Sequence, residues 1–417
     1  MLIPRRFCRL SATEENRRSR AHVDVVLLAL VFAMSLFGVV CVCVATYSPD
    51  SPSDTSFLNH IVESSYALRQ CLFLLVAPLV VGVITVFPYD ILRRRAEWFY
   101  WIAFGLLTIT TIFNGAQGVK AWMDILWGYT IQPSEFMKLA MILILAKNLS
   151  KADRPMSNMR SFMRIFLLVG IPGFVILLQG ETGSLLVIIF MFAVLMYFSN
   201  VSLKTLGVLA AIAIFGILAL YGFMLATGSQ DYRLARIAGW LNPELYSSSD
   251  AYQQTMSKMT IGSGGVSGIG MFTDHAIAQL NYVPADWTDF IYATIGETWG
   301  FVGCVAVLVG YLLILLRIMY LAWYTRDKFG RLVIIGVLGM LLFHVLENVA
   351  MTLGLMPITG IPLPFLSYGG SNMMTNMGGI GLVLNVTRNR SISIPVNTPQ
   401  TMHNPYRIHR NFRTRAY

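Results

Sequence analysis

The segment "FIYATIGETWGFVGCVAVLVGYLLILL" (290–316) is an apolar run that is long enough to cross a membrane as one helix. A hydrocarbon core about 30 Å thick needs roughly 20 such residues. The run carries a single charge, Glu297, and the polar segment "NYVPADWTD" (281–289) comes directly before it. The sequence therefore predicts a membrane helix with two carboxylates, Asp286 and Asp289, at its entrance.

Similar apolar runs recur along most of the chain. Of its 417 residues, 56% are hydrophobic and 12% are charged, and the mean hydropathy is +0.63. This composition is too apolar for a soluble domain, and no alternation of polar and apolar residues indicates a barrel. We therefore expect an all-α polytopic membrane protein with about ten transmembrane helices. The expected spans are near 24–46, 67–87, 98–114, 131–147, 161–179, 183–200, 205–227, 290–316, 332–354 and 372–387.

The basic residues predict the orientation of these spans. Most of the 31 Lys and Arg residues lie in the two tails and in one alternate set of loops. Because cytoplasmic loops retain positive charge, both termini are predicted to be cytoplasmic, and the large loop between spans seven and eight to be extracellular. The domains are then a basic tail (1–23), a membrane domain (24–387) and a second basic tail (388–417) of disordered composition. The net charge of +10 reflects this bias and an attraction to anionic lipid, and it does not indicate nucleic acid as a partner.

Three segments on the predicted outer side are rich in Gly, Pro and Trp, namely 114–138, 228–289 and 352–372. Irregular backbone survives at membrane depth only where protein or a wet cavity satisfies its polar groups. We therefore expect these segments to fold onto one another around an external cavity.

Ionisable residues also lie in or at the ends of the apolar spans. Such groups are costly unless they are paired or face water, and by default they mark a functional site. Glu135 and Lys138, at positions i and i+3, also fit a structural ion pair. The full set is Glu135, Lys138, Glu181, Glu297 and Glu347. The six histidines show no metal-ligand spacing.

The carboxylates before residue 290 have two interpretations. In one, Asp286 or Thr288 caps the following helix and Asp289 lies in its first turn, where the helix dipole favours a negative charge. In the other, Asp289 faces the cavity as a reactive group. The local sequence fits both interpretations.

Two further features lie in the large loop. Arg233 and Arg236 share a helical face and could clamp phosphate oxygens, or form a solvated basic face or a lipid headgroup contact. The run "GSGGVSGIG" (262–270) lacks the spacing of a nucleotide loop. We expect it to form a bend that lets the backbone approach a ligand or another loop.

Several motifs together resemble one family, the SEDS proteins (shape, elongation, division and sporulation), whose members include RodA, FtsW and SpoVE. The resemblance runs from the first span to about Asn385. It rests on "QPSEFMKLA" (132–140), "IGSGG" (261–265), "VPADWTDFIYATIGETWGFVG" (283–303) and "GLMPITGIPLPFLSYGGSN" (354–372). In combination these motifs are highly specific.

The resemblance implies a peptidoglycan glycosyltransferase that polymerises lipid II on the outer face of the cytoplasmic membrane. A class B penicillin-binding protein would supply crosslinking, with other divisome or elongasome membrane proteins as partners. The catalytic aspartate of the family falls in the T-D-F segment, which makes Asp289 the expected general base. Attack on the anomeric carbon by single displacement would invert its configuration.

The other expected site residues follow from the same chemistry. The pyrophosphate leaving group needs cations, for which Lys120, Lys138, Arg233 and Arg236 are candidates. A divalent ion such as Mg²⁺ or Mn²⁺ that bridges the phosphates is a further candidate. The expected supporting polar network is Gln132, Glu135, Glu181, Glu297, Ser367 and Ser371.

The chain departs from the family pattern in two places. It reads "QGETGS" (179–184) where the family has Q-P-D-x-G-T, so Glu181 replaces an aspartate and Gly180 a proline. Ala121 replaces a basic residue, which leaves Lys120 as the nearest cation. Two other functions fit the same residues: a lipid II flippase, which needs no general base, and a non-catalytic scaffold of a synthase complex. The motifs are shared by members that act in elongation, division and sporulation.

Overall fold

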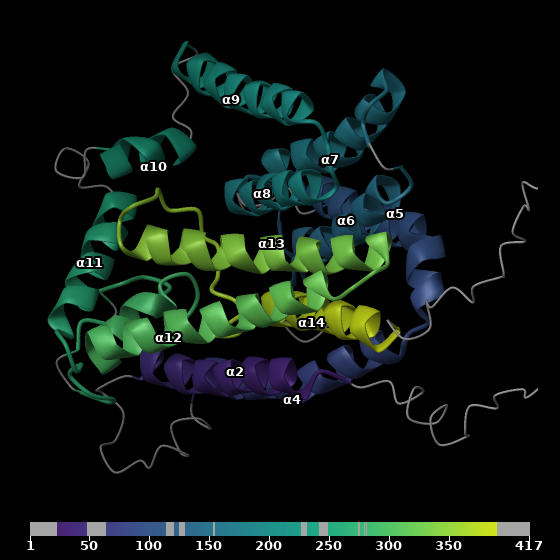
Figure 1. Ribbon diagram of the computed structural model, residues 1–417. Coiled ribbons are helices and arrows are strands. Elements are labelled where there is room, and N and C mark those ends of the chain that lie inside the picture. The colour runs from purple at the N-terminus through teal and green to yellow at the C-terminus, as the bar shows by residue number, and fades with distance from the viewer. Residues whose placement is uncertain are drawn as a thin grey trace, which may run out of the picture.

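The computed structural model describes residues 23–47, 64–113, 121–124, 130–152, 155–226, 232–241, 249–273, 276–278, 280 and 282–389. Within these ranges the chain is a bundle of helices (Figure 1). Each of the ten expected spans coincides with one helix. These helices are α2 (Val25–Ala45), α4 (Ser65–Val86), α5 (Tyr89–Phe113), α6 (Pro133–Leu149), α7 (Met159–Gln179), α8 (Thr182–Phe198), α9 (Leu203–Ala226), α12 (Ile291–Trp323), α13 (Lys328–Thr352) and α14 (Gly370–Asn389).

The remaining described elements belong to the polar segments. The large loop contains α10 (Tyr232–Leu241) and α11 (Ser249–Ser263), and the segment before α6 forms a two-stranded antiparallel ribbon of β1 (Met123–Asp124) and β2 (Thr130–Ile131). Of the described helices, α2, α4, α5, α7, α12 and α13 are long and apolar enough to cross a membrane. The predicted all-α polytopic membrane fold is confirmed.

Two helices are longer than the apolar runs that predicted them. Helix α5 begins at Tyr89, directly after Pro88, instead of near residue 98, and exposes the arginines that follow. Helix α12 continues beyond residue 316, where the apolar run ends, because Arg317 pairs with Asp24 at 2.7 Å. A charge near the end of a span thus continues the helix when it has a partner or reaches water.

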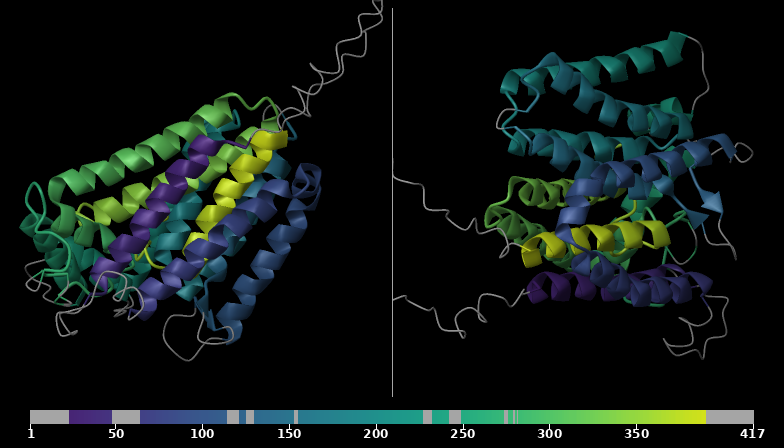
Figure 2. Two further views of the ribbon diagram at one scale, coloured as in Figure 1. Left: turned by 90° about the horizontal axis from the view of Figure 1, so that it is seen from below. Right: turned by 90° about the vertical axis from the view of Figure 1, so that its right-hand side faces the viewer.

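The two described ends of the membrane domain lie at the same end of the bundle. Asp24, the N-cap of α2, binds Arg317 near the end of α12. Asn385, in the last turns of α14, donates to the carbonyls of Ile84 and Phe87 at the end of α4. Figure 2 shows the start of α2 and the end of α14 on one side. Which side faces the cytoplasm stays a prediction from the charges.

Helix α13 forms the centre of the bundle. It packs against α6, α8, α12 and α14 (Figure 1). In its most apolar stretch 78% of the residues are buried inside the protein, against 22% for α4. The peripheral helices therefore offer apolar side chains to lipid, whereas polar side chains on α13 must find partners inside the protein.

Helix α12 is interrupted at Gly300, where φ is 65° and ψ is −161°. The carbonyls of Glu297 and Thr298 accept hydrogen bonds from the amides of Ile269 and Gly270, at 3.0 and 3.1 Å. A segment of the large loop thus satisfies backbone groups that the broken helix leaves open, as irregular backbone in a membrane requires.

The glycine-rich bend at 262–270 makes this contact possible. A Cβ atom on Gly264 would lie 2.0 Å from the carbonyl oxygen of Gly296, and one on Gly268 would lie 2.2 Å from that of Thr298. No side chain fits at either distance. The prediction that this run lets two backbones approach closely is confirmed.

Candidate functional site

A cavity of about 560 Å³ lies at the end of the bundle opposite Asp24 and Arg317. The three polar segments predicted to fold together all contribute to its wall, as do α6, α8, α13 and α14. Its polar lining consists of Gln132, Glu135, Lys138, Glu181, Ser184, Arg236, Thr288, Asp289, His344, Thr359, Tyr368, Ser371 and Asn372.

The starts of several helices surround this cavity. Helix α6 begins with Pro133 at its first position, where the missing amide is not needed. Helix α7 ends at Gly180 in the left-handed conformation (φ 90°), so that α8 starts almost at once. The starts of α6, α8 and α14 bring partial positive charge to the cavity wall, which favours anions, whereas the end of α7 brings the opposite sign.

Asp289 precedes helix α12 and does not lie in its first turn. The N-cap is Phe290, and no side chain caps the helix. The hydroxyl of Thr288 donates to the carbonyl of Ala285 at 3.0 Å, and the carboxylate of Asp286 is buried without a side-chain hydrogen-bond partner among the described residues. The capping interpretation is therefore wrong, because the polar residues before Phe290 turn inward before the helix begins.

The loop after α13 holds Asp289 in the cavity wall. Asn348 of α13 donates from its side-chain amide to the carbonyl oxygens of Asp289 and Ile361, each at 2.7 Å. A Cβ atom on Gly360 (φ 71°) would lie 3.3 Å from Oδ2 of Asp289. The backbone of the loop thus packs closely against the carboxylate.

Arg236 of α10 is the cation that acts on Asp289. Its Nη1 donates to the carbonyl of Ile358 at 3.2 Å, which joins α10 to the loop after α13. Burial raises the pKa of Asp289 to about 6, while Arg236 acts in the opposite direction. Asp289 is therefore ionised at neutral pH and is more basic than a solvated aspartate.

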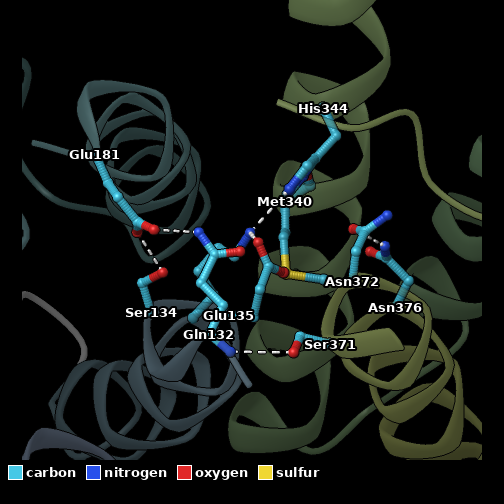
Figure 3. Close-up of polar contacts among 10 residues, drawn as sticks. Gln132, Ser134, Glu135, Glu181, Met340, His344, Ser371, Asn372 and Asn376 are labelled. Carbon is cyan, nitrogen blue, oxygen red and sulfur yellow. Dashed lines mark hydrogen bonds and ion pairs between the residues drawn. The ribbon is translucent and has the colours of Figure 1, made fainter. Parts of the chain in front are cut away.

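Lys138 lies at the centre of a second polar group. Its Nζ is 2.7 Å from Oε1 of Glu135 and 2.9 Å from Nε2 of His344. Because Nδ1 of His344 lies 2.7 Å from the carbonyl oxygen of Met340, which can only accept, Nε2 is the acceptor for Lys138. The side chains of Lys138 and Glu135 are 1% and 3% exposed. The predicted ion pair is confirmed, and Figure 3 shows Glu135 and His344 within the network.

Glu181 organises a third group. The side chains of Gln132 and Ser134 donate hydrogen bonds to its two carboxylate oxygens. The backbone amide of Gln132 donates to Oγ of Ser371 at 3.1 Å (Figure 3). Burial raises the pKa of Glu181, and the two donors act against this. Both carboxylate oxygens of Glu181 therefore bind residues at the start of α6. Because Glu181 directly precedes α8 and Ser371 lies at the start of α14, this group connects α6 to the starts of α8 and α14.

Glu297, expected in the supporting network, lies outside the cavity lining. Its carboxylate accepts from the amides of Ile277 and Ala278 at 2.7 and 2.9 Å, and from Oγ of Ser263 at 3.1 Å. It fixes the segment between α11 and α12 against α12.

Ser367 also lies behind the wall. Its hydroxyl accepts from the amide of Leu363 at 2.8 Å and donates to the carbonyl of Thr288. Glu297 and Ser367 therefore shape the loops around the cavity, and the structure does not bring them to its surface.

Two of the expected phosphate ligands are not placed. Lys120 lies outside the described residues, and the side chain of Arg233 does as well, although its backbone lies in the helix that was expected there. Sequence reasoning in turn missed Thr288, His344, Thr359 and Asn372 as lining residues. Thr359 and Asn372 lie in the motif at 354–372, which was the available signal.

The described residues do not fit a metal centre held by the protein. No group of three or more His, Cys, Asp or Glu side chains among them could hold a metal ion. Of the lining carboxylates, Glu135 is paired with Lys138, and Glu181 binds Gln132 and Ser134. We derive no step through a metal, and a divalent ion that bridges substrate phosphates stays a prediction.

The fold and the site define a polytopic membrane protein with a charged cavity at one end of its helical bundle. A family model described as "Cell cycle protein", for FtsW, RodA and SpoVE, matches residues 24–392. The chain belongs to this family, and the resemblance found in its motifs is confirmed.

Curated relatives match over nearly their whole length. Stage V sporulation protein E of Bacillus subtilis (strain 168) is 31% identical over 373 residues, which cover 88% of this chain and 97% of the relative. Peptidoglycan glycosyltransferase MrdB of Escherichia coli (strain K12) is 26% identical over 374 residues, covering 89% and 95%.

Solved structures show the same fold. A chain described under "Structural coordination of polymerization and crosslinking by a peptidoglycan synthase complex" superposes with a TM-score of 0.71 at 28% identity, covering 88% of this chain and 98% of that one. The rod shape determining protein RodA of Thermus thermophilus gives a TM-score of 0.63 at 27% identity, covering 88% and 97%.

Proposed function

We propose that this protein is a peptidoglycan glycosyltransferase that polymerises lipid II into glycan strands, with Asp289 as its general base. The observation that carries the proposal is the position of Asp289, a carboxylate with a raised pKa in the wall of a cavity that also holds Arg236 and Lys138. Two further supports are the names of the curated relatives and the structural match to a peptidoglycan synthase complex.

The proposed reaction is a single displacement at the anomeric carbon of the donor sugar. Asp289 takes the proton from the acceptor hydroxyl as its oxygen attacks, which a base near the operating pH does most effectively. The bond to the lipid pyrophosphate breaks on the opposite side, so the configuration inverts. Arg236, Lys138 and the surrounding helix starts stabilise the charge that develops on the pyrophosphate.

Arg236 connects substrate binding to the strength of the base. In the free protein its positive charge lowers the pKa of Asp289. A bound phosphate would compensate that charge, and the pKa of Asp289 would then rise. The site thus gains a stronger base when the donor occupies it.

The same proposal assigns the location and the partners. The basic loops favour the cytoplasmic membrane with the cavity facing outside, where a lipid-linked sugar presents its reacting groups. A class B penicillin-binding protein would crosslink the product, as the synthase complex described for the structural neighbour suggests. Other divisome or elongasome membrane proteins would join this assembly, without nucleic acid.

Replacement of Asp289 by Asn tests the proposal. Purified Asp289→Asn protein, with its transpeptidase partner and lipid II, should lose at least about 100-fold in polymerisation rate, because the amide cannot accept the proton. Asp124→Asn, at an exposed carboxylate on β1, is the matched control and should keep the wild-type rate. Unchanged polymerisation by Asp289→Asn would disprove the role of Asp289 as the base, and absence of polymerisation by the wild-type protein would disprove the enzymatic role. Lipid II translocation across vesicles, measured in parallel, then separates a flippase from a non-catalytic scaffold, since neither requires a base.

A further inference from the structure

Three successive backbone carbonyls before α12, those of residues 287–289, accept hydrogen bonds from one part of the chain. In order, the donors are the backbone amide of Tyr368 at 2.9 Å, the hydroxyl of Ser367, and the side-chain amide of Asn348 at 2.7 Å. The last of the three carbonyls belongs to Asp289. Because α12 begins without a side-chain cap, these contacts fix the backbone that carries the Asp289 side chain.

Two of the three donors also bind the loop after α13. Nδ2 of Asn348 donates to the carbonyl of Ile361 at 2.7 Å, and Oγ of Ser367 accepts from the amide of Leu363 at 2.8 Å. Asn348 and Ser367 therefore each join the segment before α12 to the loop after α13.

The same loop also holds Arg236, the cation that α10 contributes to the cavity lining. Nη1 of Arg236 donates to the carbonyl of Ile358 at 3.2 Å. Two residues further on, a Cβ atom on Gly360 would lie 3.3 Å from Oδ2 of Asp289. The loop thus runs from the bound guanidinium to the carboxylate. By binding both this loop and the backbone of Asp289, Asn348 fixes where the base lies relative to Arg236.

The side chain of Asn348 serves through its two donors. It is 0% exposed and lies on α13, at the centre of the bundle. Both protons of Nδ2 are used, because a backbone carbonyl can only accept. Oδ1 is buried without a hydrogen-bond partner among the described residues. A buried acceptor without a partner costs free energy, so the two donated bonds come at some expense of stability.

Asn385 of α14 offers a matched case at the other end of the bundle. It is also 0% exposed, and its Nδ2 donates to the carbonyls of Ile84 at 2.8 Å and of Phe87. Both asparagines satisfy buried carbonyls, which the inside of a membrane protein requires. Of the two, Asn348 is the one whose acceptors belong to residues of the cavity lining.

We propose that Asn348 and Ser367 are positioning residues for Asp289: their bonds fix its backbone to the loop after α13, so that the carboxylate is held beside Arg236 and in reach of the acceptor hydroxyl. The inference rests on the proposed function of Asp289. Neither Asn348 nor Ser367 belongs to the cavity lining, and the proton still passes from the acceptor hydroxyl to Asp289.

A positioning role predicts which kinetic constant changes. The base must lie within about 3–3.5 Å of the group with which it reacts, and a small misplacement slows the chemical step. The cations that bind the pyrophosphate stay in place. Loss of the bonds should therefore lower kcat and leave KM for lipid II unchanged.

The replacement Asn348→Leu removes both donors and keeps a branched side chain of similar shape. In purified protein with its transpeptidase partner, kcat for lipid II polymerisation should fall about 10- to 100-fold, and KM should stay within about two-fold. The value is taken per protein molecule that binds fluorescent lipid II at saturation, so that inactive protein does not lower it. Asn385→Leu, the matched control, should keep the wild-type kcat even where its stability falls.

The replacement Ser367→Ala removes the second side-chain contact with a smaller change. It should lower kcat several-fold, again with an unchanged KM. A wild-type kcat in Asn348→Leu would overturn the proposal, as would an equal loss of kcat in Asn385→Leu or an effect that lies in KM. If Asn348→Leu does not fold, Ser367→Ala decides by the same criteria.

The two proposals fail in distinguishable ways. If Asp289→Asn still polymerises lipid II at the wild-type rate, the role of Asp289 as the base is wrong, whatever the other variants do. If polymerisation requires Asp289 and Asn348→Leu keeps the wild-type kcat, only the positioning role is wrong.

Discussion

The two walls of the cavity treat their acidic residues differently. On the α6 wall, Glu135 is ion-paired with Lys138, and Glu181 accepts from Gln132 and Ser134, while Oε2 of Glu135 has no hydrogen-bond partner among the described residues. Behind the wall formed by α12 and α13, the carboxylate oxygens of Asp286 and one oxygen of Glu347 have no hydrogen-bond partner among the described residues. A carboxylate held by a cation or by two hydrogen-bond donors is kept in one state, whereas a carboxylate without them can gain or lose a proton. The α6 wall is thus suited to hold charge, and the opposite wall to move a proton.

The largest effect should come from breaking the ion pair between Lys138 and Glu135 on the α6 wall. Lys138→Met leaves Glu135 buried and without its partner, which costs about 3–5 kcal/mol of unfolding free energy. Denaturant titration of the purified protein measures this loss. The double variant Glu135→Leu, Lys138→Met should recover most of the stability and remain inactive, because the cation for the pyrophosphate is absent. Recovery of activity would show that the pair is only structural.

Removal of the positive charge of Arg236 should weaken substrate binding. We expect Arg236→Ala to raise KM for lipid II by about 10-fold, a typical loss for a charge-assisted phosphate contact, with normal insertion into the membrane. Arg236→Lys, which keeps the charge, should recover part of the loss. Wild-type KM in Arg236→Ala at normal protein abundance would exclude the residue from donor binding.

The proposed proton transfer to Asp289 should also determine the pH dependence of the activity. Since the pKa of Asp289 is raised to about 6 and the ionised form is the base, activity should be about half of its plateau near pH 6 and should fall as the pH decreases further. A steady-state profile with a stability control at each pH measures this. A flat profile below pH 6 would place the essential base elsewhere.

The smallest effect is expected at Asp286. Burial raises the pKa of this carboxyl well above its usual range, which favours its neutral form. Asp286→Asn should therefore change the polymerisation rate by less than about two-fold, since the amide resembles the neutral acid. A loss as large as that of Asp289→Asn would show that both carboxylates on this wall carry out proton chemistry.

The spans could be predicted because apolar length is a local property of a membrane helix. Their bounds were wrong at α5 and α12. In α12, Arg317 is retained in the helix by Asp24, a partner nearly three hundred positions away in the chain. Local sequence contains no sign of such a pairing.

The site was predictable to the extent that charge in an apolar context signals it. This signal found Asp289, Lys138, Glu135 and Glu181, which the cavity brings together. The same signal also selected Glu297, which instead binds backbone amides of the large loop. What separates these cases is the partner that tertiary folding supplies, and His344 became part of the site only through its contact with Lys138.

The break in α12 at Gly300 has a consequence for how the outer loop exchanges with solvent. The amides of Ile269 and Gly270 are bound to carbonyls of α12, so their deuterium uptake should be as slow as that of a transmembrane helix. The glycine-rich segment 262–270 therefore does not act as a flexible linker. It stabilises the interrupted helix α12, whose first residues follow Asp289.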